Sequence, residues 1–463
     1  MVKKPLVVAV SAACLNLSVI AAANAAGFIE DSKATLSLRN FYYNNDNRNE
    51  ASYAARNPSK VEEWGQGFLL NYQSGFTQGT VGFGVDAIGM LGLRLDGSGH
   101  AGRATNSNQP GTMFPRETDG SSVDEFSTVG ATAKMKISQT ELRYGTLMPK
   151  LPVITFNDGR ILPQTFLGGQ VTSKEIKDVT LTAGQIEHVK GRASSNYEEM
   201  SIAGSNSGST ARDSNQFRFA GADYKVTKDL TLQYYFGQLE DFYSQHFLGL
   251  THSVKLGEGT FKTDLRYFDS NGDGANKNAD TQGALYASSG YYGRTATGAV
   301  TRGEVDNRLY SALFTYSIKG HTFGAGYQGS NGNSDFPFLN QGDGASAYII
   351  TDLQINKFAR SGEDTWQARY SYDFGQLGMK GLTAGIIYQY GDNIRTRNGD
   401  YMEWERDLTL SYVVPEGQLK GLGFTWRNAS LRSDLPAAST QGVPGQRDQD
   451  ENRFIVSYTL PLL

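Results

Sequence analysis

The segment Thr365–Phe374, TWQARYSYDF, decides the fold, because apolar and polar residues alternate along its whole length. Its even-numbered residues are Trp, Ala, Tyr, Tyr and Phe, and its odd-numbered residues are Thr, Gln, Arg, Ser and Asp. Successive side chains of a β-strand point to opposite faces, so this period of two predicts a strand with one apolar and one polar face. The same alternation recurs at 35–39, 382–390, 407–412 and 453–460.

The alternation recurs often enough to predict about eighteen strands, many of them near 10 residues long, including one at Tyr348–Phe358. Short turns alternate with long connections rich in Gly, Asn, Ser and Asp. The long connections, which we expect on the extracellular side, are 96–125, 189–215, 269–306, 329–346, 391–402 and 430–451. This pattern indicates an all-β fold, a transmembrane antiparallel β-barrel whose apolar face meets lipid and whose polar face lines a lumen.

One segment interrupts the succession of strands. Leu151–Phe166, LPVITFNDGRILPQTF, contains two prolines and an Asn-Asp-Gly turn. Proline cannot donate to a sheet ladder, so the segment is predicted to be a loop rather than part of the wall. Its apolar residues gain nothing from lying in water and must be covered by protein. We therefore expect an inward-folded constriction loop that narrows the barrel and presents Arg160 to whatever passes.

The N-terminal residues have the features of a secretory signal. Lys3 and Lys4 precede an apolar run, and Ala23-Asn24-Ala25 has the small-x-small form of a cleavage site. We expect a signal peptide at 1–25 and a single barrel domain at 26–463. No later apolar run approaches the ~20 residues that a helical membrane span requires, which excludes a helical membrane protein.

Composition and motifs exclude several classes of function. A net charge of −4 over 463 residues gives no electrostatic footprint for nucleic acid. The chain has five histidines, none at metal-ligand spacing to another ligand and none beside a Gly-x-Ser-x-Gly turn. We therefore expect a protein that is not an enzyme and that uses no cofactor.

One acidic stretch has a second interpretation. Residues 269–280 place Asp269, Asn271, Asp273 and Asp280 at the spacing of a calcium-binding loop, with Asp where Glu is usual at the twelfth position. Flanking helices are not predicted, and Asn, Asp and Gly are common turn formers. We therefore favour a surface loop and expect no metal site.

Cations gather on the polar face of the predicted strands. They are Arg39, Lys134, Lys136, Arg143, Arg218, Arg266, Arg369, Arg427 and Arg453. A cation at the lipid-facing midplane would cost ~2–4 kcal/mol, so their placement toward the lumen is physically required. They either pair with Glu141, Asp264 and Asp373 to fill the interior, or hold the carboxylate of a solute in a planar fork.

Several segments resemble the OprD family of Gram-negative outer-membrane porins. The most specific are 27–32 (GFIEDS), 38–40 (LRN), 74–86 (SGFTQGTVGFGVD), 160–165 (RILPQT) and 365–370 (TWQARY), and the resemblance extends over nearly the whole mature chain. It implies an eighteen-stranded monomeric channel for small carboxylates, embedded in outer-membrane lipid and lipopolysaccharide.

The resemblance also implies which residues meet the substrate. Arg160 matches the constriction arginine, and Arg427 and Arg453 match two positions of an arginine ladder that conducts the carboxylate. Two other ladder positions are Ser411 and Thr425, so the ladder is thinner in this chain. We expect compensation from Lys357, Arg369 and Arg39.

Family members that carry basic amino acids have two acidic groups opposite the ladder, and the matching positions are Ala345 and Lys357. A substrate cation facing Lys357 is repelled, which disfavours arginine-like substrates. The stretch 336–360 is instead similar to the subgroup that passes benzoate- and vanillate-like acids. Phe336 and Phe338 either offer an aromatic substrate a flat apolar face or only pack a loop. Further expected pocket positions are Ser346 and Asp352.

Together these observations predict an outer-membrane channel through which small carboxylates, aromatic or cyclic, diffuse into the periplasm. One alternative within the family is a channel for basic amino acids and small peptides. An alternative from another class is a barrel adhesin or outer-membrane enzyme with its chemistry in the loops.

Overall fold

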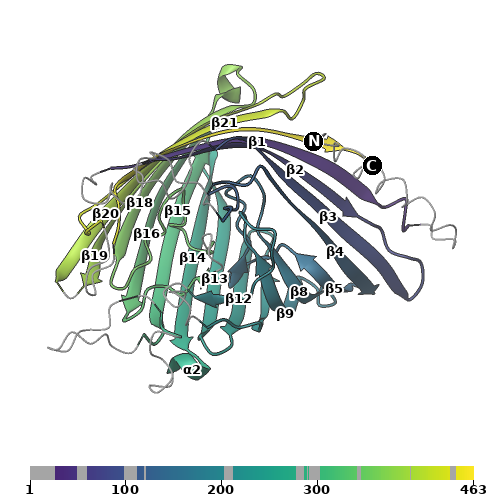
Figure 1. Ribbon diagram of the computed structural model, residues 1–463, viewed down its shortest axis with the longest axis horizontal. Coiled ribbons are helices and arrows are strands. Elements are labelled where there is room, and N and C mark those ends of the chain that lie inside the picture. The colour runs from purple at the N-terminus through teal and green to yellow at the C-terminus, as the bar shows by residue number, and fades with distance from the viewer. Residues whose placement is uncertain are drawn as a thin grey trace.

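The computed structural model describes residues 27–48, 60–97, 112–118, 121–202, 212–277, 286–288, 290, 303–340, 346–396, 398–437 and 445–463. They form an 18-stranded antiparallel sheet (Figure 1). Its strands are β1 (Lys33–Asn47), β2 (Lys60–Gln73), β3 (Val81–Asp96), β4 (Glu125–Ile137), β5 (Thr140–Leu147), β8 (Thr165–Ser173), β9 (Val179–Lys190), β11 (Phe217–Lys225), β12 (Leu230–Leu239), β13 (Tyr243–Leu256), β14 (Gly259–Gly272), β15 (Asp306–Ile318), β16 (His321–Gly332), β18 (Asp364–Asp373), β19 (Leu382–Thr396), β20 (Gly399–Val413), β21 (Gly423–Ser433) and β22 (Gln449–Pro461).

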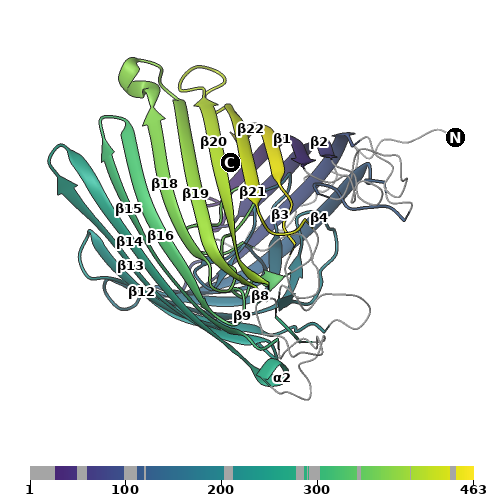
Figure 2. The same ribbon diagram turned by 90° about the vertical axis from the view of Figure 1, so that its left-hand side faces the viewer.

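The sheet closes on itself between its first and last strands. β1 pairs with β2 on one side and with β22 on the other, and the second pairing runs from Thr35 opposite Pro461 to Asn47 opposite Gln449. Every other strand pairs with its neighbours along the chain, so strands β12 to β22 run side by side in order (Figure 2). Closure leaves no unpaired edge, which a sheet needs in order to cross a membrane.

The predicted alternation is confirmed in β18. Trp366 is 61% exposed on the outer surface, whereas Thr365 and Gln367 are buried on the inner side. Arg369 has the same parity and also points inward, where it bonds other lumen residues. The apolar face is therefore the lipid face and the polar face lines the lumen.

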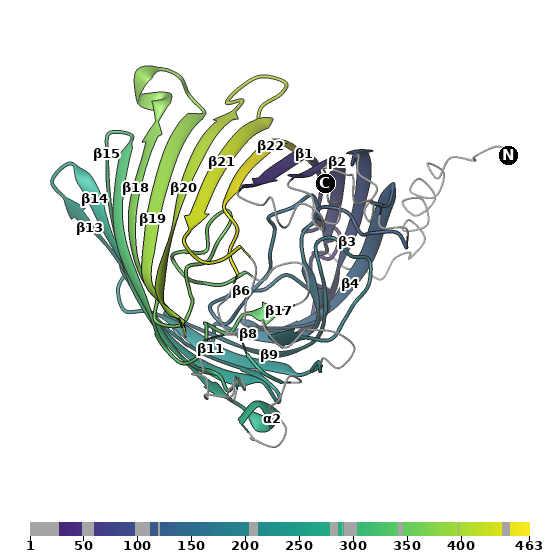
Figure 3. The same ribbon diagram turned by 60° about the vertical axis from the view of Figure 1, so that its left-hand side comes forward.

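Two segments enter the barrel instead of extending its wall. The first inward segment, 148–164, contains the short hairpin of β6 (Lys150–Leu151) and β7 (Ile154–Thr155). The second inward segment, 333–363, contains β17 (Leu339–Asn340), which pairs with β10 (Ser201–Ile202). An isolated bridge between Thr155 and Ser346 joins the two segments. Figure 3 shows β6 and β17 inside the ring of strands. The predicted constriction loop is thus confirmed over 151–164, whereas Thr165 and Phe166 of the predicted range belong to β8, and the second inward segment lies against the loop.

The structure corrects two details of the strand assignment. Tyr348–Phe358 is not a strand but part of the second inward segment, because the N–H groups of Ile355 and Asn356 bond a carboxylate and not a neighbouring strand. The stretch 391–402 is not a long connection, since β19 continues to Thr396 and β20 begins at Gly399.

The helices in the described part of the chain are the single turns α2 (Gly274–Lys277) and η2 (Phe374–Leu377). None of them is long and apolar enough to cross a membrane. Asp269 and Asn271, expected in a surface loop, lie in β14, and Asp280 lies outside the described residues, as does the predicted signal peptide. Among the described residues no group of three His, Cys, Asp or Glu could hold a metal ion.

Candidate functional site

The first inward segment lies directly against the wall at β2. A Cβ atom added to Gly67 would lie 2.7 Å from the backbone oxygen of Ile161, so only glycine permits this approach. Ile161 and Leu162 are almost fully buried in an apolar cluster that includes Phe114. Apolar burial and close backbone contact therefore fix the position of the loop that carries Arg160.

A fork of hydrogen bonds holds the tip of this loop. Arg39 donates to the two carboxylate oxygens of Asp158 at 2.7 and 3.0 Å, and to the backbone oxygen of Arg160 at 2.7 Å. The guanidinium of Arg160 lies over the ring of Tyr43, 4.7 Å from its centroid. Arg453 approaches the same ring at 6.0 Å. Arg39, Arg160 and Arg453 thus form one cationic cluster around the tip.

Arg453 is only 5% exposed and does not reach open lumen. It forms an ion pair with Glu451 and donates to the backbone oxygen of Gln354 at 2.7 Å. Glu451 also accepts from the hydroxyl of Tyr43 at 2.8 Å. Arg453 therefore anchors the second inward segment, and its charge is compensated within the protein.

Arginines of the wall hold the carbonyl groups of the second inward segment. Arg266 donates to the backbone oxygen of Tyr348 at 3.1 Å and lies 4.0 Å over the ring of the same residue. Arg369 donates to the backbone oxygen of Ile350 at 2.6 Å. A pair of carbonyls inside the barrel thereby receives charged donors, which form stronger hydrogen bonds than neutral ones.

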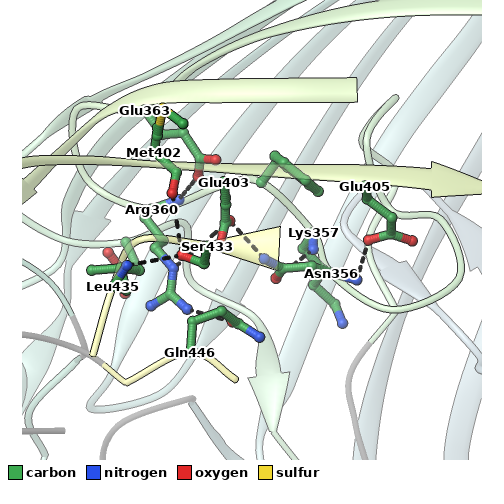
Figure 4. A network of polar contacts seen from close by, with 12 residues as sticks. Asn356, Lys357, Arg360, Glu363, Met402, Glu403, Glu405, Ser433, Leu435 and Gln446 are labelled. Atoms are coloured by element: carbon green, nitrogen blue, oxygen red, sulfur yellow. Dashed lines mark hydrogen bonds and ion pairs between the residues drawn. The ribbon is translucent and has the colours of Figure 1, made fainter. Parts of the chain in front are cut away.

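Carboxylates of β20 hold the N–H groups of the same segment (Figure 4). Glu405 accepts from the backbone of Ile355 at 2.9 Å and of Asn356 at 2.8 Å. Glu403 accepts from the side chain of Asn356 at 2.6 Å. The N–H groups of the second inward segment are therefore bound by carboxylates of β20, and its carbonyl groups are bound by arginines of β14 and β18.

Glu363 closes this network at the end of the segment. It accepts from the backbone of Arg360 at 2.9 Å and lies beside Glu403 (Figure 4). Burial raises the pKa of Glu363 well above its ordinary value, and the neighbouring carboxylate of Glu403 raises this pKa further. The protonated form of Glu363 is therefore favoured more than it is in an exposed glutamate.

Four predicted site residues lie together on the second inward segment. Asp352 accepts from the backbone of Ala347 at 2.8 Å and from the hydroxyl of Ser346 at 3.3 Å. The ammonium of Lys357 lies 3.9 Å from Asp352 and 5.3 Å over the ring of Phe338. Asp352 and Ser346 therefore shape the loop, and Asp352 also lines a cavity of the lumen.

The two phenylalanines differ in position. Phe336 is 4% exposed and packs edge-on against Phe268 with ring centroids 5.1 Å apart, so most of its surface packs the loop, and the remainder lines the same cavity as Phe338. Phe338 is half-buried and borders a cavity of about 160 Å³ together with Lys357 and Arg360. Ala345, which the family resemblance places opposite the ladder, lies outside the described residues.

A larger cavity of about 500 Å³ lies beside the periplasmic halves of β15 to β21. Arg369, Arg427, Asp352 and Asp407 are among its lining residues. Asp407 is buried in the wall, whereas Arg427 is exposed to the lumen. Among the residues that the structure describes, Arg427 has no hydrogen-bonding or ion-pair partner, which leaves its fork of donors available to a solute.

The remaining cations confirm the predicted placement and pairing only in part. Arg218, predicted to face the lumen, lies on the outer face of β11, because its neighbours Phe217 and Phe219 are the residues buried inside the barrel. Glu141 pairs with Arg143, and Asp264 forms a two-point ion pair with Arg266 at 2.8 Å for each contact. Asp373, predicted to pair with a cation, instead accepts from the backbone of Gly375 and caps η2.

Asp158, Tyr43 and Glu405 were missed by sequence reasoning, although they complete the site. Asp158 belongs to the Asn-Asp-Gly turn beside Arg160, and Glu405 lies on the polar face of β20. The alternation assigned Tyr43 and Glu405 to the lumen face, but the bonding partners of all three residues are distant in sequence. The sequence pattern could therefore identify them only as lumen residues.

Comparison with known proteins agrees with this architecture. Residues 26–462 match the family described as outer membrane porin, OprD family. The porin-like protein GalP of Pseudomonas putida is 35% identical over 440 residues, which cover 95% of this chain and 94% of that protein. Porin D of Pseudomonas aeruginosa is 32% identical over 464 residues, covering 95% of this chain and 93% of that protein.

Solved structures are similar over the same range. The Pseudomonas aeruginosa porin OccK8 (OprE) is 60% identical, with a TM-score of 0.84 and coverage of 95% of this chain and 100% of that one. OpdK of the same organism, solved with vanillate, is 33% identical, with a TM-score of 0.78 and coverage of 94% and 100%. This chain therefore belongs to the OprD family of outer-membrane porins and is a β-barrel channel of the Gram-negative outer membrane, not an enzyme.

Proposed function

We propose that this porin selects small monocarboxylates with an aromatic or cyclic body and lets them diffuse into the periplasm. The observation that carries the proposal is Arg427, a cation without a hydrogen-bonding or ion-pair partner in the described chain, beside the cavity of about 500 Å³ that Arg369 also lines. A guanidinium matches a carboxylate in a planar two-point contact.

The strength of such a contact suits a channel. At about 4 Å and an effective dielectric constant near 20, a charge pair is worth ~4 kcal/mol before desolvation. That attraction recruits an anion from water without holding it permanently, which conduction requires. Arg160 and Arg369 make no ion pair with a carboxylate in the described structure, and they extend the attraction from the loop tip to the cavity.

Phe338 and Lys357 support the aromatic part of the proposal. The half-buried ring and the ammonium above it border one cavity, so an aromatic acid could place its ring on Phe338 and its carboxylate toward Lys357. The relative OpdK has been solved with vanillate, an aromatic carboxylate.

A channel for basic amino acids is the second candidate, because Asp352 and Asp407 line the same cavity as Arg427. Asp352 is engaged by the Ala347 N–H and faces Lys357 at 3.9 Å, which weakens its attraction for a substrate cation. We therefore rank this candidate below the carboxylate channel.

The test is uptake of labelled benzoate and labelled arginine into liposomes that contain the porin, at equal gradients and modest salt. We expect benzoate to be preferred and Arg427→Ala to weaken its apparent affinity by about tenfold, equivalent to ~1.4 kcal/mol. Arg218→Ala is the control for the loss of an arginine as such, because Arg218 lies on the outer face of β11, away from the lumen. Preference for arginine, or equal losses in both variants, would contradict the proposal.

We also infer that the mature channel, 26–463, acts as a monomer after removal of 1–25. Closure of the barrel within one chain supports the monomer, and the exposed aromatic outer face suits contact with lipid and lipopolysaccharide. N-terminal sequencing and the mass of the purified protein test both points.

A further inference from the structure

We propose that Asp158 is a specificity-determining residue, whose carboxylate occupies Arg39 at the constriction and competes there with the carboxylate of the substrate. The two-point contact between them, at 2.7 and 3.0 Å, has the geometry by which an arginine holds a carboxylate ligand. Arg39 therefore has the geometry of a carboxylate-binding site, and the side chain of Asp158 occupies it.

The pair is open to the lumen. The side chain of Asp158 is 45% exposed and that of Arg39 is 28% exposed. A solute passing the loop tip can therefore reach both groups without unfolding the segment. This distinguishes the pair from Arg453 and Glu451, which are both buried.

The surroundings of Asp158 are cationic. Asp158 is the one carboxylate of the tip sequence Asn157–Arg160. Arg192 donates to the side chain of Asn157 at 3.1 Å, and a Cβ atom at Gly159 would lie 3.2 Å from Arg192. The guanidinium of Arg453 is 3.9 Å from the same point. These guanidinium groups attract an anion to the loop tip, and the carboxylate of Asp158 already occupies that position.

The loop does not depend on Asp158 for its shape. Asn157 closes the turn by accepting from the backbone of Gly159 at 2.9 Å, and its backbone oxygen accepts from Gln164 at 2.9 Å. Arg39 keeps a separate bond to the backbone oxygen of Arg160 at 2.7 Å. The carboxylate of Asp158 has Arg39 as its hydrogen-bonding partner in the described structure. Neutralising Asp158 therefore releases Arg39 while other bonds hold the tip.

The consequence is a constriction that binds the carboxylate of the substrate with only moderate affinity. A tethered carboxylate has an effective concentration of about the millimolar range or higher, so a dilute substrate does not displace it. Removing the competitor makes a further cation available and tightens binding. Weak binding at the constriction favours release and hence flux at high substrate concentration.

The experiment uses the full chain in liposomes, with the initial uptake rate of benzoate measured against concentration. For Asp158→Asn we expect the half-saturating concentration to fall by about two- to fivefold, the range in which an exposed ion pair competes. Arg39→Gln breaks the same ion pair but removes the site, so we expect its half-saturating concentration to stay unchanged or rise. If both variants shift it in the same direction, Asp158 is only a tether and the proposal is overturned.

Glu141→Gln is the charge-matched control, because Glu141 pairs with Arg143 on the lumen face away from the tip. An equal shift in this variant would show a long-range effect of charge and would also overturn the proposal. The choice of benzoate rests on the function proposed above. A second measurement, the zero-current potential of each variant in a gradient of KCl, does not depend on that function. We expect Asp158→Asn to shift this potential toward chloride selectivity more than Glu141→Gln does. Failure of the benzoate preference with this shift retained would reject the proposed function but not the role of Asp158.

Discussion

The two inward segments narrow the same barrel, but they are attached to it by different forces. The first, 148–164, rests on buried apolar side chains such as Leu162 and on backbone contact with Gly67. The second, 333–363, also packs against an apolar cluster, yet its central part is held by charged groups of the wall: Arg266 and Arg369 bind its carbonyls, and Glu405 binds its N–H groups.

This difference decides how each segment responds to change. Apolar contact is non-directional, but close packing makes it sensitive to any volume that is added or removed. A buried hydrogen bond is directional, and removing one partner leaves the other unsatisfied at a cost of about 1–3 kcal/mol. The first segment should therefore be sensitive to the shape of the wall, and the second to its charge.

Replacement of Gly67 by Val should give the largest effect. The new side chain would collide with the backbone oxygen of Ile161, which lies 2.7 Å from the ideal Cβ position, and would force the first segment off the wall at a cost of about 3 kcal/mol. We expect a larger single-channel conductance and weaker anion selectivity in planar bilayers.

Gly89→Val is the control for this change, since the nearest atom to a Cβ at Gly89 is 3.6 Å away. Similar conductance in the two variants would show that contact with β2 does not position the first segment.

Glu405→Gln should have an intermediate effect, confined to the second segment. The amide oxygen can keep one of the bonds to Ile355 and Asn356, while the amide group offers no second acceptor, at a cost of about 1–2 kcal/mol. We expect more frequent current fluctuations in single-channel recordings with the mean conductance nearly preserved.

Glu416→Gln, at an exposed periplasmic turn, makes the same chemical change away from the lumen. Quiet recordings from Glu405→Gln would show that the carboxylate is not an anchor of the segment.

Glu363→Gln should have the smallest effect, below about 1 kcal/mol, because the pKa of Glu363 is raised by burial and by Glu403, and an amide resembles a protonated carboxyl. The raised pKa means that the folded state binds the proton more tightly than the unfolded state, so this group's contribution to stability falls as pH rises above 4.5 toward the raised pKa. We expect the melting temperature of the variant to depend less on pH in that window. An unchanged pH dependence would show that Glu363 is ionised in the folded barrel.

The same comparison explains which features were predictable. The apolar, proline-containing first segment stood out from the alternating strands, so the constriction loop was expected and is present. The stretch Tyr348–Phe358 was wrongly assigned to a strand, because it also mixes apolar and polar residues and contains no proline. What keeps it out of the wall is a carboxylate fifty residues later in the chain, at Glu405.

The sequence by itself determined the barrel, its lipid and lumen faces, and most of the cations that line the lumen, Arg218 being the exception on the outer face. These features follow from the period of two along each strand and from the cost of placing a charge in lipid. Both depend on each residue and its neighbours in the sequence, not on contacts between distant residues. Only the tertiary structure decided which of those cations are compensated: Arg39 by Asp158, Arg453 by Glu451, and Arg427 by no hydrogen-bonding or ion-pair partner in the described chain. Pairing depends on distances between residues far apart in the sequence, and Coulomb attraction depends on those distances rather than on residue type.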